Sequence, residues 1–160
     1  MESPTVNVEG RRLGPDDALL GVNALALLKA PDGYAPPSAA YSSTFLFRHE
    51  NVLIVAMARN TPVGYVVAYL LDRVDRHQQM MFFYEIGVAE SHRRRGIGTR
   101  LIREPKSICR ANDVMKMWVP TGRSNIAATR LYASTGAVPL PGRDEVTYAY
   151  PRENFMQGAE

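Results

Sequence analysis

Residues 88–98 read V-A-E-S-H-R-R-R-G-I-G and stand between a strand-like segment and a helix-like one. Gly96 and Gly98 carry no Cβ atom that would keep a ligand away from the backbone, so this loop can turn its N–H groups toward an anion. The helix that begins near Gly98 adds unpaired N–H groups and the positive end of its dipole. Together with the three arginines that precede Gly96, these groups predict a site for two linked phosphates.

The spacing of this loop separates it from two common nucleotide-binding loops. The phosphate loop of nucleotide hydrolases needs a Lys after its last Gly, and the dinucleotide fingerprint needs three spaced glycines. Residues 88–98 have neither feature. A triple arginine by itself is more often a solvated charged surface, so the prediction depends on the neighbouring strand, glycines and helix.

A second motif lies downstream, at residues 125–136, which read N-I-A-A-T-R-L-Y-A-S-T-G. Taken alone, Asn125 is a good helix cap and Tyr132 is a half-buried aromatic at helical spacing. Together and in this order, the two motifs resemble those of the GNAT (GCN5-related N-acetyltransferase) family. Its members carry an Arg/Gln-x-x-Gly-x-Gly/Ala loop after a strand ending in Val, and a later helix with Leu-Tyr before a Gly.

The resemblance covers nearly the whole chain and implies a single α/β domain over residues 1–160, with the GNAT fold: a mixed central β-sheet of about six to seven strands with helices on both faces. The residue pattern agrees with this order of elements. The expected strands span residues 6–11, 52–58, 63–71, 80–88, 114–119, 137–140 and 146–150. The expected helices span residues 15–30, 42–49, 98–112 and 125–134. Pro105 predicts a kink or a restart in the third helix, because proline removes a backbone hydrogen bond.

The resemblance also implies acetyl-CoA (coenzyme A) as the cofactor. The strand that ends in Val88 is expected to pair with the pantetheine arm, the loop is expected to bind the pyrophosphate, and Asn125 is expected to contact the cofactor. The residues assigned in this way are Ile86, Gly87, Val88, Arg93, Arg94, Arg95, Gly96, Ile97, Gly98, Thr99 and Asn125.

Acyl transfer to an amine needs one group that takes a proton from the amine and another that protonates the departing thiolate. Tyr132 matches the general acid of the family. Glu85, three residues before Val88, is the candidate base, because a carboxylate there can bind an ammonium ion and accept its proton, directly or through water. The alternative for Glu85 is an ion pair within the sheet. The histidines show no spacing that predicts a metal site.

One branch of the family is most similar, the type I aminoglycoside 3-N-acetyltransferases. The similar stretches are R-x-L-G-P-D-D at residues 11–17, V-G-Y-V-V-A-Y-L-L at 63–71 and the run from 84 to 98. This implies acetylation of the 3-amino group of an aminoglycoside antibiotic, which gives resistance. A polycationic acceptor favours a cleft of carboxylates. The residues expected to line the acceptor site are Asp72, Tyr84, Glu85, Asp144 and Glu145.

Two other functions remain as alternatives to aminoglycoside acetylation. One difference between this sequence and the aminoglycoside branch favours considering them. Gly122 and Arg123 stand where that branch carries acidic residues. A GNAT enzyme that acts on a polyamine, an amino acid, a protein N-terminus or a lysine would share the same cofactor residues. So would a non-catalytic CoA-binding module, although the presence of both Glu85 and Tyr132 favours an enzyme.

Composition is that of an ordinary globular domain, with 46% hydrophobic and 22% charged residues among 160. The net charge of +3 is concentrated around the loop arginines, and no stripe of basic and aromatic residues predicts nucleic-acid binding. No segment predicts a membrane span or a secretory signal, and the single Cys109 cannot form an internal disulfide, so a cytoplasmic location is expected. The apolar edge strands are compatible with a homodimer.

Overall fold

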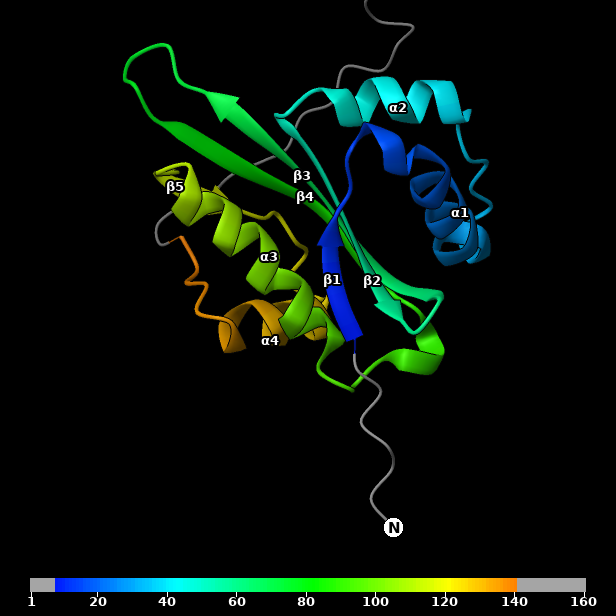
Figure 1. Cartoon of the computed structure of the whole chain (residues 1–160). Coiled ribbons are helices and arrows are strands. Elements are labelled where there is room, and N and C mark those ends of the chain that lie inside the picture. The colour runs from blue at the N-terminus through cyan, green and yellow to red at the C-terminus, as the bar shows by residue number, and fades with distance from the viewer. Residues whose placement is uncertain (1–7, 141–160) are drawn as a thin grey trace, which may run out of the picture.

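The computed structural model describes residues 8–140 and places five strands of this range in one mixed sheet (Figure 1). The strands are β1 (Val8–Arg12), β2 (Asn51–Ala58), β3 (Thr61–Asp72), β4 (Gln79–Val88) and β5 (Lys116–Trp118). They follow one another in the sheet in chain order. Strands β1 to β4 are antiparallel neighbours, and β5 pairs with β4 in parallel.

Four α-helices in the described range cover the two faces of the sheet. They are α1 (Ala18–Lys29), α2 (Ala39–Phe47), α3 (Ile97–Ala111) and α4 (Ile126–Ser134), with short 3-10 turns at Pro15–Asp17, Ala30–Asp32 and Glu90–His92. Figure 1 shows α1 and α2 on one side of the sheet and α3 with α4 on the other. The prediction of a mixed sheet with helices on both faces is therefore confirmed.

Strand β2 separates two hydrophobic cores, because successive side chains of a strand point to opposite faces. Ile54 belongs to the core on the α3 side, together with Leu101. Leu53 belongs to the core on the α1 and α2 side, together with Leu46. Since both faces are covered, β2 is apolar almost throughout instead of alternating with polar residues.

Helix α3 buries one face, formed by Ile97, Leu101, Ile102 and Pro105. The sequence predicts a kink or a restart at Pro105, and since the helix continues from Ile97 to Ala111, the restart does not occur. The proline ring is fully buried and fills a core position, and the packing around it holds the helix together although one backbone hydrogen bond is missing.

The expected count of six to seven strands is not matched. Residues 137–140 form no strand, because Gly136 has a φ of 90° and Ala137 N–H turns back to bond the Tyr132 carbonyl at 3.0 Å. Pro139 also lacks the N–H that a strand would use. The strand expected at 146–150 lies outside the described residues. Strand β5 is shorter than the predicted 114–119, since Val114 N–H still bonds the Cys109 carbonyl at 2.9 Å.

Helix α2 begins three residues earlier than predicted. The Ser38 hydroxyl accepts a hydrogen bond from Tyr41 N–H at 3.1 Å and so caps the first turn. None of the helices within residues 8–140 combines the length and hydrophobicity that crossing a bilayer requires.

Leu101 is fully buried where α3 packs on the sheet, whereas Leu19 on α1 is 63% exposed. We expect Leu101→Ala to lower the free energy of unfolding by about 2–5 kcal/mol, because it opens a cavity between helix and sheet. Leu19→Ala, the matched control, should change it by less than about 0.5 kcal/mol. Urea unfolding measures both, and equal midpoints for the two variants would contradict this account of the core.

Candidate functional site

Strand β4 has a neighbour along the whole of one edge but along only part of the other. Strand β3 pairs with it from Gln79 to Val88. Strand β5 pairs only with its first part, and the last pair is Phe82 with Trp118. In the described part of the chain, no strand pairs with the second edge of β4 beyond Phe82. The backbone there is open to an extended ligand that adds to the sheet as a strand would.

A β-bulge interrupts β4 next to this opening. Val67 of β3 faces Glu85, and the next residue, Ala68, faces Phe83, so Tyr84 is an extra residue without a partner. Phe83 belongs to the core on the α3 side. Glu85 lies on the opposite face, where it contacts the end of α1. The bulge thus directs both Tyr84 and Glu85 to the α1 side of the sheet.

Glu85, the predicted base, already has two partners. Lys29, the last residue of α1, donates from Nζ to both carboxylate oxygens at 2.9 Å. The Tyr65 hydroxyl donates to Glu85 Oε1 at 2.6 Å. A carboxylate offers about four lone-pair positions, so roughly one is left for an acceptor amine or a water molecule. The sequence alternative for Glu85 is an ion pair within the sheet, whereas the structure takes its ionic partner, Lys29, from helix α1, and the sheet neighbour Tyr65 contributes a hydrogen bond.

Gly87 makes room for the Tyr65 ring. A Cβ at position 87 would lie 2.3 Å from Tyr65 Cε1, which no real contact allows. Tyr65 of β3 pairs with Gly87 of β4. Because Gly87 has no side chain, the Tyr65 ring can lie over it, and the Tyr65 hydroxyl reaches Glu85. Burial and the hydrogen bond to Glu85 raise the pKa of Tyr65, so this phenol stays neutral and serves as a donor.

Lys29 and Tyr65 were missed by sequence reasoning. Lys29 lies 56 residues from Glu85 along the chain, and no local pattern connects the two. A signal for Tyr65 did exist: an isolated Gly inside a strand indicates a close approach of another group, and Gly87 was assigned only to the cofactor.

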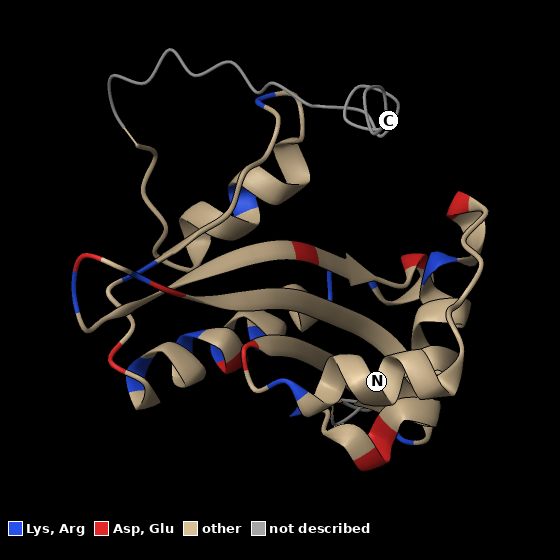
Figure 2. Cartoon of the chain, turned by 90° about the horizontal axis from the view of Figure 1, so that it is seen from above, with Lys and Arg blue, Asp and Glu red and all other residues tan. Residues whose placement is uncertain are grey.

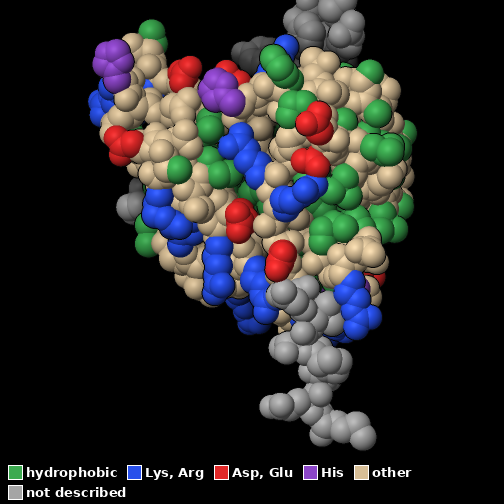
Figure 3. All heavy atoms as spheres, viewed as in Figure 1, with side chains coloured by type: hydrophobic (Ala, Val, Ile, Leu, Met, Phe, Trp, Pro, Cys, Tyr) green, Lys and Arg blue, Asp and Glu red, His purple; other side chains and the backbone are tan. Residues whose placement is uncertain are grey.

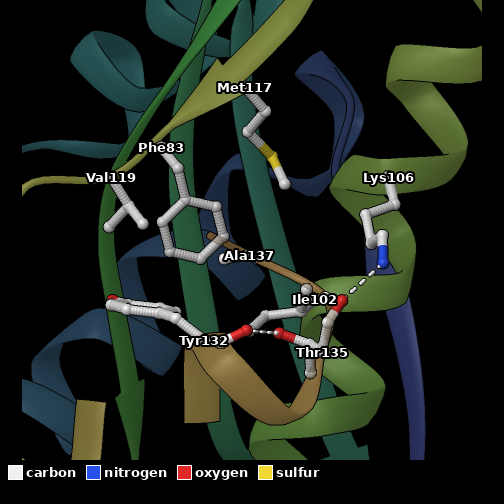
Figure 4. A pocket seen from close by; sticks show the side chains of 9 residues that line it. Phe83, Ile102, Lys106, Met117, Val119, Tyr132, Thr135 and Ala137 are labelled. Carbon is white, nitrogen blue, oxygen red and sulfur yellow. Dashed lines mark hydrogen bonds between the residues drawn. The ribbon is translucent and has the colours of Figure 1, made fainter. Parts of the chain in front are cut away.

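Tyr132, the predicted general acid, lies on the other face of β4. Its ring packs edge-on against Phe83, with centroids 6.2 Å apart. It borders a mostly apolar cavity of about 150 Å³, and Figure 4 shows its hydroxyl directed away from Lys106. Burial raises the pKa of Tyr132, so the phenol keeps its proton at neutral pH. Glu85 and Tyr132 therefore flank β4 from opposite sides.

The arginine loop leads directly into α3. Gly96 has a φ of 75° and Arg94 a φ of 59°, two left-handed residues that turn the chain sharply before the helix. The first helical bond runs from Arg100 N–H to the Gly96 carbonyl at 3.1 Å, so the amides of Ile97, Gly98 and Thr99 precede the helical ladder. Figure 3 shows basic side chains gathered on the face where α3 lies.

The three loop arginines differ in their surroundings. Arg93 donates from Nε to the Val88 carbonyl at 3.1 Å and ties the loop to the end of β4. Arg94 and Arg95 are exposed beside the helix start. Asn125 caps α4, since its Oδ1 accepts from Ala128 N–H at 3.1 Å. This cap is the structural alternative that the sequence offers for Asn125.

The residues expected to line the acceptor site do not all come together. Tyr84 is adjacent to Glu85 and 57% exposed. Asp72 accepts from Gln79 Nε2 at 2.8 Å, near the turn of the β3–β4 hairpin, and Figure 2 shows that turn at one end of the sheet. Glu85 lies six positions along β4 from Gln79, a distance of about 20 Å. Asp144 and Glu145 lie outside the described residues.

Other reactive groups offer no second centre among residues 8–140. No group of three or more His, Cys, Asp or Glu side chains in this range has the arrangement to hold a metal ion. Burial raises the pKa of the Cys109 thiol, and its Sγ lies 3.6 Å from Met81 Sδ in the core. A protonated, half-buried thiol is a poor nucleophile.

Comparison with known proteins identifies the fold. A family model described as "Acetyltransferase (GNAT) family" matches residues 22–137. No curated protein sequence matches the chain. Among solved structures, an aminoglycoside acetyltransferase from an uncultured soil metagenomic sample, in complex with sisomicin, is similar with a TM-score of 0.78 and 19% identity over 89% of this chain and 94% of that one.

Two further structures share the fold but differ in their named acceptors. An aminoglycoside N-acetyltransferase in complex with CoA has a TM-score of 0.72 and 18% identity, covering 91% of this chain and 95% of that one. Ribosomal-protein-alanine N-acetyltransferase from Brucella melitensis biovar Abortus 2308 has a TM-score of 0.67 and 21% identity, covering 90% and 98%. At these identities the likeness establishes the fold alone.

The contact between Gly87 and Tyr65 is testable by adding one methyl group. We expect Gly87→Ala to lower the free energy of unfolding by about 1–3 kcal/mol, because the Tyr65 ring must leave its place over β4. Gly122→Ala is the matched control, since a Cβ there meets only Ser124 Oγ at 3.7 Å. Thermal and urea unfolding compare the two variants. Equal stability of Gly87→Ala and Gly122→Ala would show that the ring is not confined by Gly87.

Proposed function

The chain belongs to the acetyltransferase (GNAT) family, and we propose that it transfers the acetyl group of acetyl-CoA to an amine of a small molecule, with Glu85 and Tyr132 as its catalytic pair. The observation that carries this proposal is their placement. The two side chains flank β4 on opposite faces, next to the point where β4 and β5 separate. A donor and an acceptor of protons on either side of one opening suit a reaction in which one bond forms as another breaks.

The described residues fit acetyl-CoA, which supplies the thioester. The open edge of β4 at Ile86, Gly87 and Val88 offers backbone groups to the pantetheine arm. The sharp turn at Gly96 and the amides of Ile97, Gly98 and Thr99 offer donors to the pyrophosphate. The remaining residues proposed to contact the cofactor are Arg93, Arg94, Arg95 and Asn125.

Proton movement follows from the surroundings of the two catalytic side chains. Glu85 would accept the proton that the acceptor nitrogen loses as the C–N bond forms, directly or through a water molecule. Lys29 and Tyr65 would hold its carboxylate in a fixed direction, because both donate to it. Tyr132 would give its phenol proton to the sulfur as the C–S bond breaks.

The acceptor is the finer part of the proposal. The sequence resemblance indicates an aminoglycoside and its 3-amino group, and a cationic amine suits a carboxylate at the opening. Solved aminoglycoside enzymes share the fold at about 20% identity, and so does an enzyme named for ribosomal-protein alanine. Another amine therefore stands beside the aminoglycoside as an alternative. A homodimer and a cytoplasmic location stay predictions.

Thiol release from acetyl-CoA tests the proposed reaction. With a panel of kanamycin, gentamicin, spermidine, a lysine peptide and simple monoamines, we expect turnover with at least one amine. An alkaline decrease of kcat from loss of the Tyr132 proton should be centred above the ordinary tyrosine pKa of about 10, because burial raises the pKa of this phenol. Tyr132→Phe should lower kcat at every pH by about 10²- to 10⁴-fold.

Two outcomes would contradict these assignments. An alkaline decrease of kcat centred below about pH 9 that disappears in Tyr132→Phe would mean that the phenol titrates early, against its burial. Absence of thiol release with every amine, while calorimetry still detects acetyl-CoA binding, would favour a CoA-binding module over an enzyme.

Two single substitutions distinguish proton acceptance by Glu85 from its ion pair with Lys29. Glu85→Gln keeps an oxygen for Lys29 and Tyr65 but cannot take a proton, so kcat should fall by about 10²- to 10⁴-fold. Lys29→Met removes the partner and keeps the carboxylate, so we expect less than about a ten-fold loss. Steady-state kcat measures both. Equal and small losses in the two variants would assign Glu85 to the ion pair alone.

A further inference from the structure

A row of five aromatic rings crosses the α1 side of the sheet beside Glu85. It runs from Phe45 of α2 through Tyr69 of β3, and through Tyr84 and Phe82 of β4, to Trp118 of β5. The centroid distances along this aromatic row are 6.2, 5.9, 5.8 and 5.1 Å, with three edge-to-face contacts and a stacked one between Phe82 and Trp118. The catalytic mechanism uses none of these rings.

The middle of the aromatic row, at Tyr84, adjoins Glu85, and this part of the row is partly exposed. Tyr84 precedes Glu85 in the bulge, so their Cα atoms are about 3.8 Å apart. Tyr84 is 57% exposed, and Phe82 and Trp118 beside it are only partly buried. Phe82 and Trp118 also form the last pair before β4 and β5 separate. An apolar group on this row would therefore lie next to the opening of the sheet.

The charges around Glu85 limit the acceptor further. Lys29 neutralises Glu85, and Asp32 is near enough to Tyr65 to contribute to the raised pKa of its phenol. Two carboxylates and one ammonium group give this cluster a net charge of −1, and Asp72 lies at the far end of the hairpin. A single ammonium group matches the charge of this cluster, and the described residues bring no further carboxylate into it.

We propose that the acceptor is a monoamine whose amino group is joined by a short carbon chain to an aromatic ring. The amine meets Glu85, and the ring packs on Tyr84 and Phe82 of the aromatic row. The inference rests on the proposed acetyl transfer and adds the class of acceptor. Aromatic side chains around a few directed polar groups are the usual lining of a site for such a molecule.

Kinetics with matched amines test this class of acceptor. We expect kcat/KM for 2-phenylethylamine to exceed that for n-butylamine, which has the same amino group without the ring, by about ten-fold. Kanamycin and spermidine should be poorer acceptors than 2-phenylethylamine. Tyr84→Ala should raise KM for 2-phenylethylamine by about three- to ten-fold with little change in kcat, and Tyr84→Phe should rescue it.

Trp118 supplies a readout that does not depend on turnover. It is the single tryptophan of the chain and is stacked on Phe82, so its fluorescence reports directly on the aromatic row. We expect a saturable change with 2-phenylethylamine, little change with n-butylamine, and weaker binding in Tyr84→Ala. Phe47→Ala is the control, because Phe47 is 79% exposed on α2 and is not one of the five rings.

The two readouts separate this inference from the proposed function. A saturable fluorescence change without thiol release would support the aromatic row as a binding site and refute acetyl transfer. Turnover of kanamycin or spermidine, with 2-phenylethylamine no better than n-butylamine and no effect of Tyr84→Ala on KM, would overturn the aromatic acceptor and keep acetyl transfer. Equal effects of Tyr84→Ala and Phe47→Ala would also overturn it.

Discussion

The separation of β4 from β5 is the constraint on which the other features of the site depend. Pairing stops after Phe82 and Trp118, although β4 continues for six more residues beside β3. Among residues 8–140, one backbone edge of β4 is thereby left without a strand neighbour, in a sheet whose two faces are covered by helices. Glu85 of β4 points to one face of the sheet, and Tyr132 of α4 packs against Phe83 of β4 on the other face, so the two proposed catalytic side chains lie on either side of this opening.

The first helix is coupled to this opening through an ion pair. Lys29 ends α1, and its ammonium group holds both oxygens of Glu85, with side chains that are 21% and 31% exposed. Such a partly buried pair costs desolvation, which the Tyr65 hydrogen bond helps to offset. Gly87 is the residue that allows this arrangement, because any side chain there would displace the Tyr65 ring. One small residue on β4 thus fixes the direction of the carboxylate.

The sequence predicts well what is encoded by neighbouring residues. Residues 88–98 encode strand end, turn and helix start within one short stretch, and the structure has each in place. The bulge at Tyr84 and the pairing of Lys29 with Glu85 are different, since they result from the register of β3 and the end of a helix far away in the chain. Pro105 shows another way in which local sequence misleads. Helix propensity predicts a break there, but burial of the proline ring keeps α3 continuous.

The same distinction explains why the cofactor side of the site is easier to infer than the acceptor side. The cofactor would be held mainly by backbone groups of β4 and of the first turn of α3, and backbone geometry persists while side chains vary. The proposed acceptor would meet side chains from α1, α2, β3, β4 and β5, so single substitutions on separate elements would change the acceptor chemistry. A fold shared with enzymes named for aminoglycosides and for ribosomal-protein alanine is the expected result. The acceptor must therefore be inferred from the rings and charges around Glu85, and not from the likeness of the sheet.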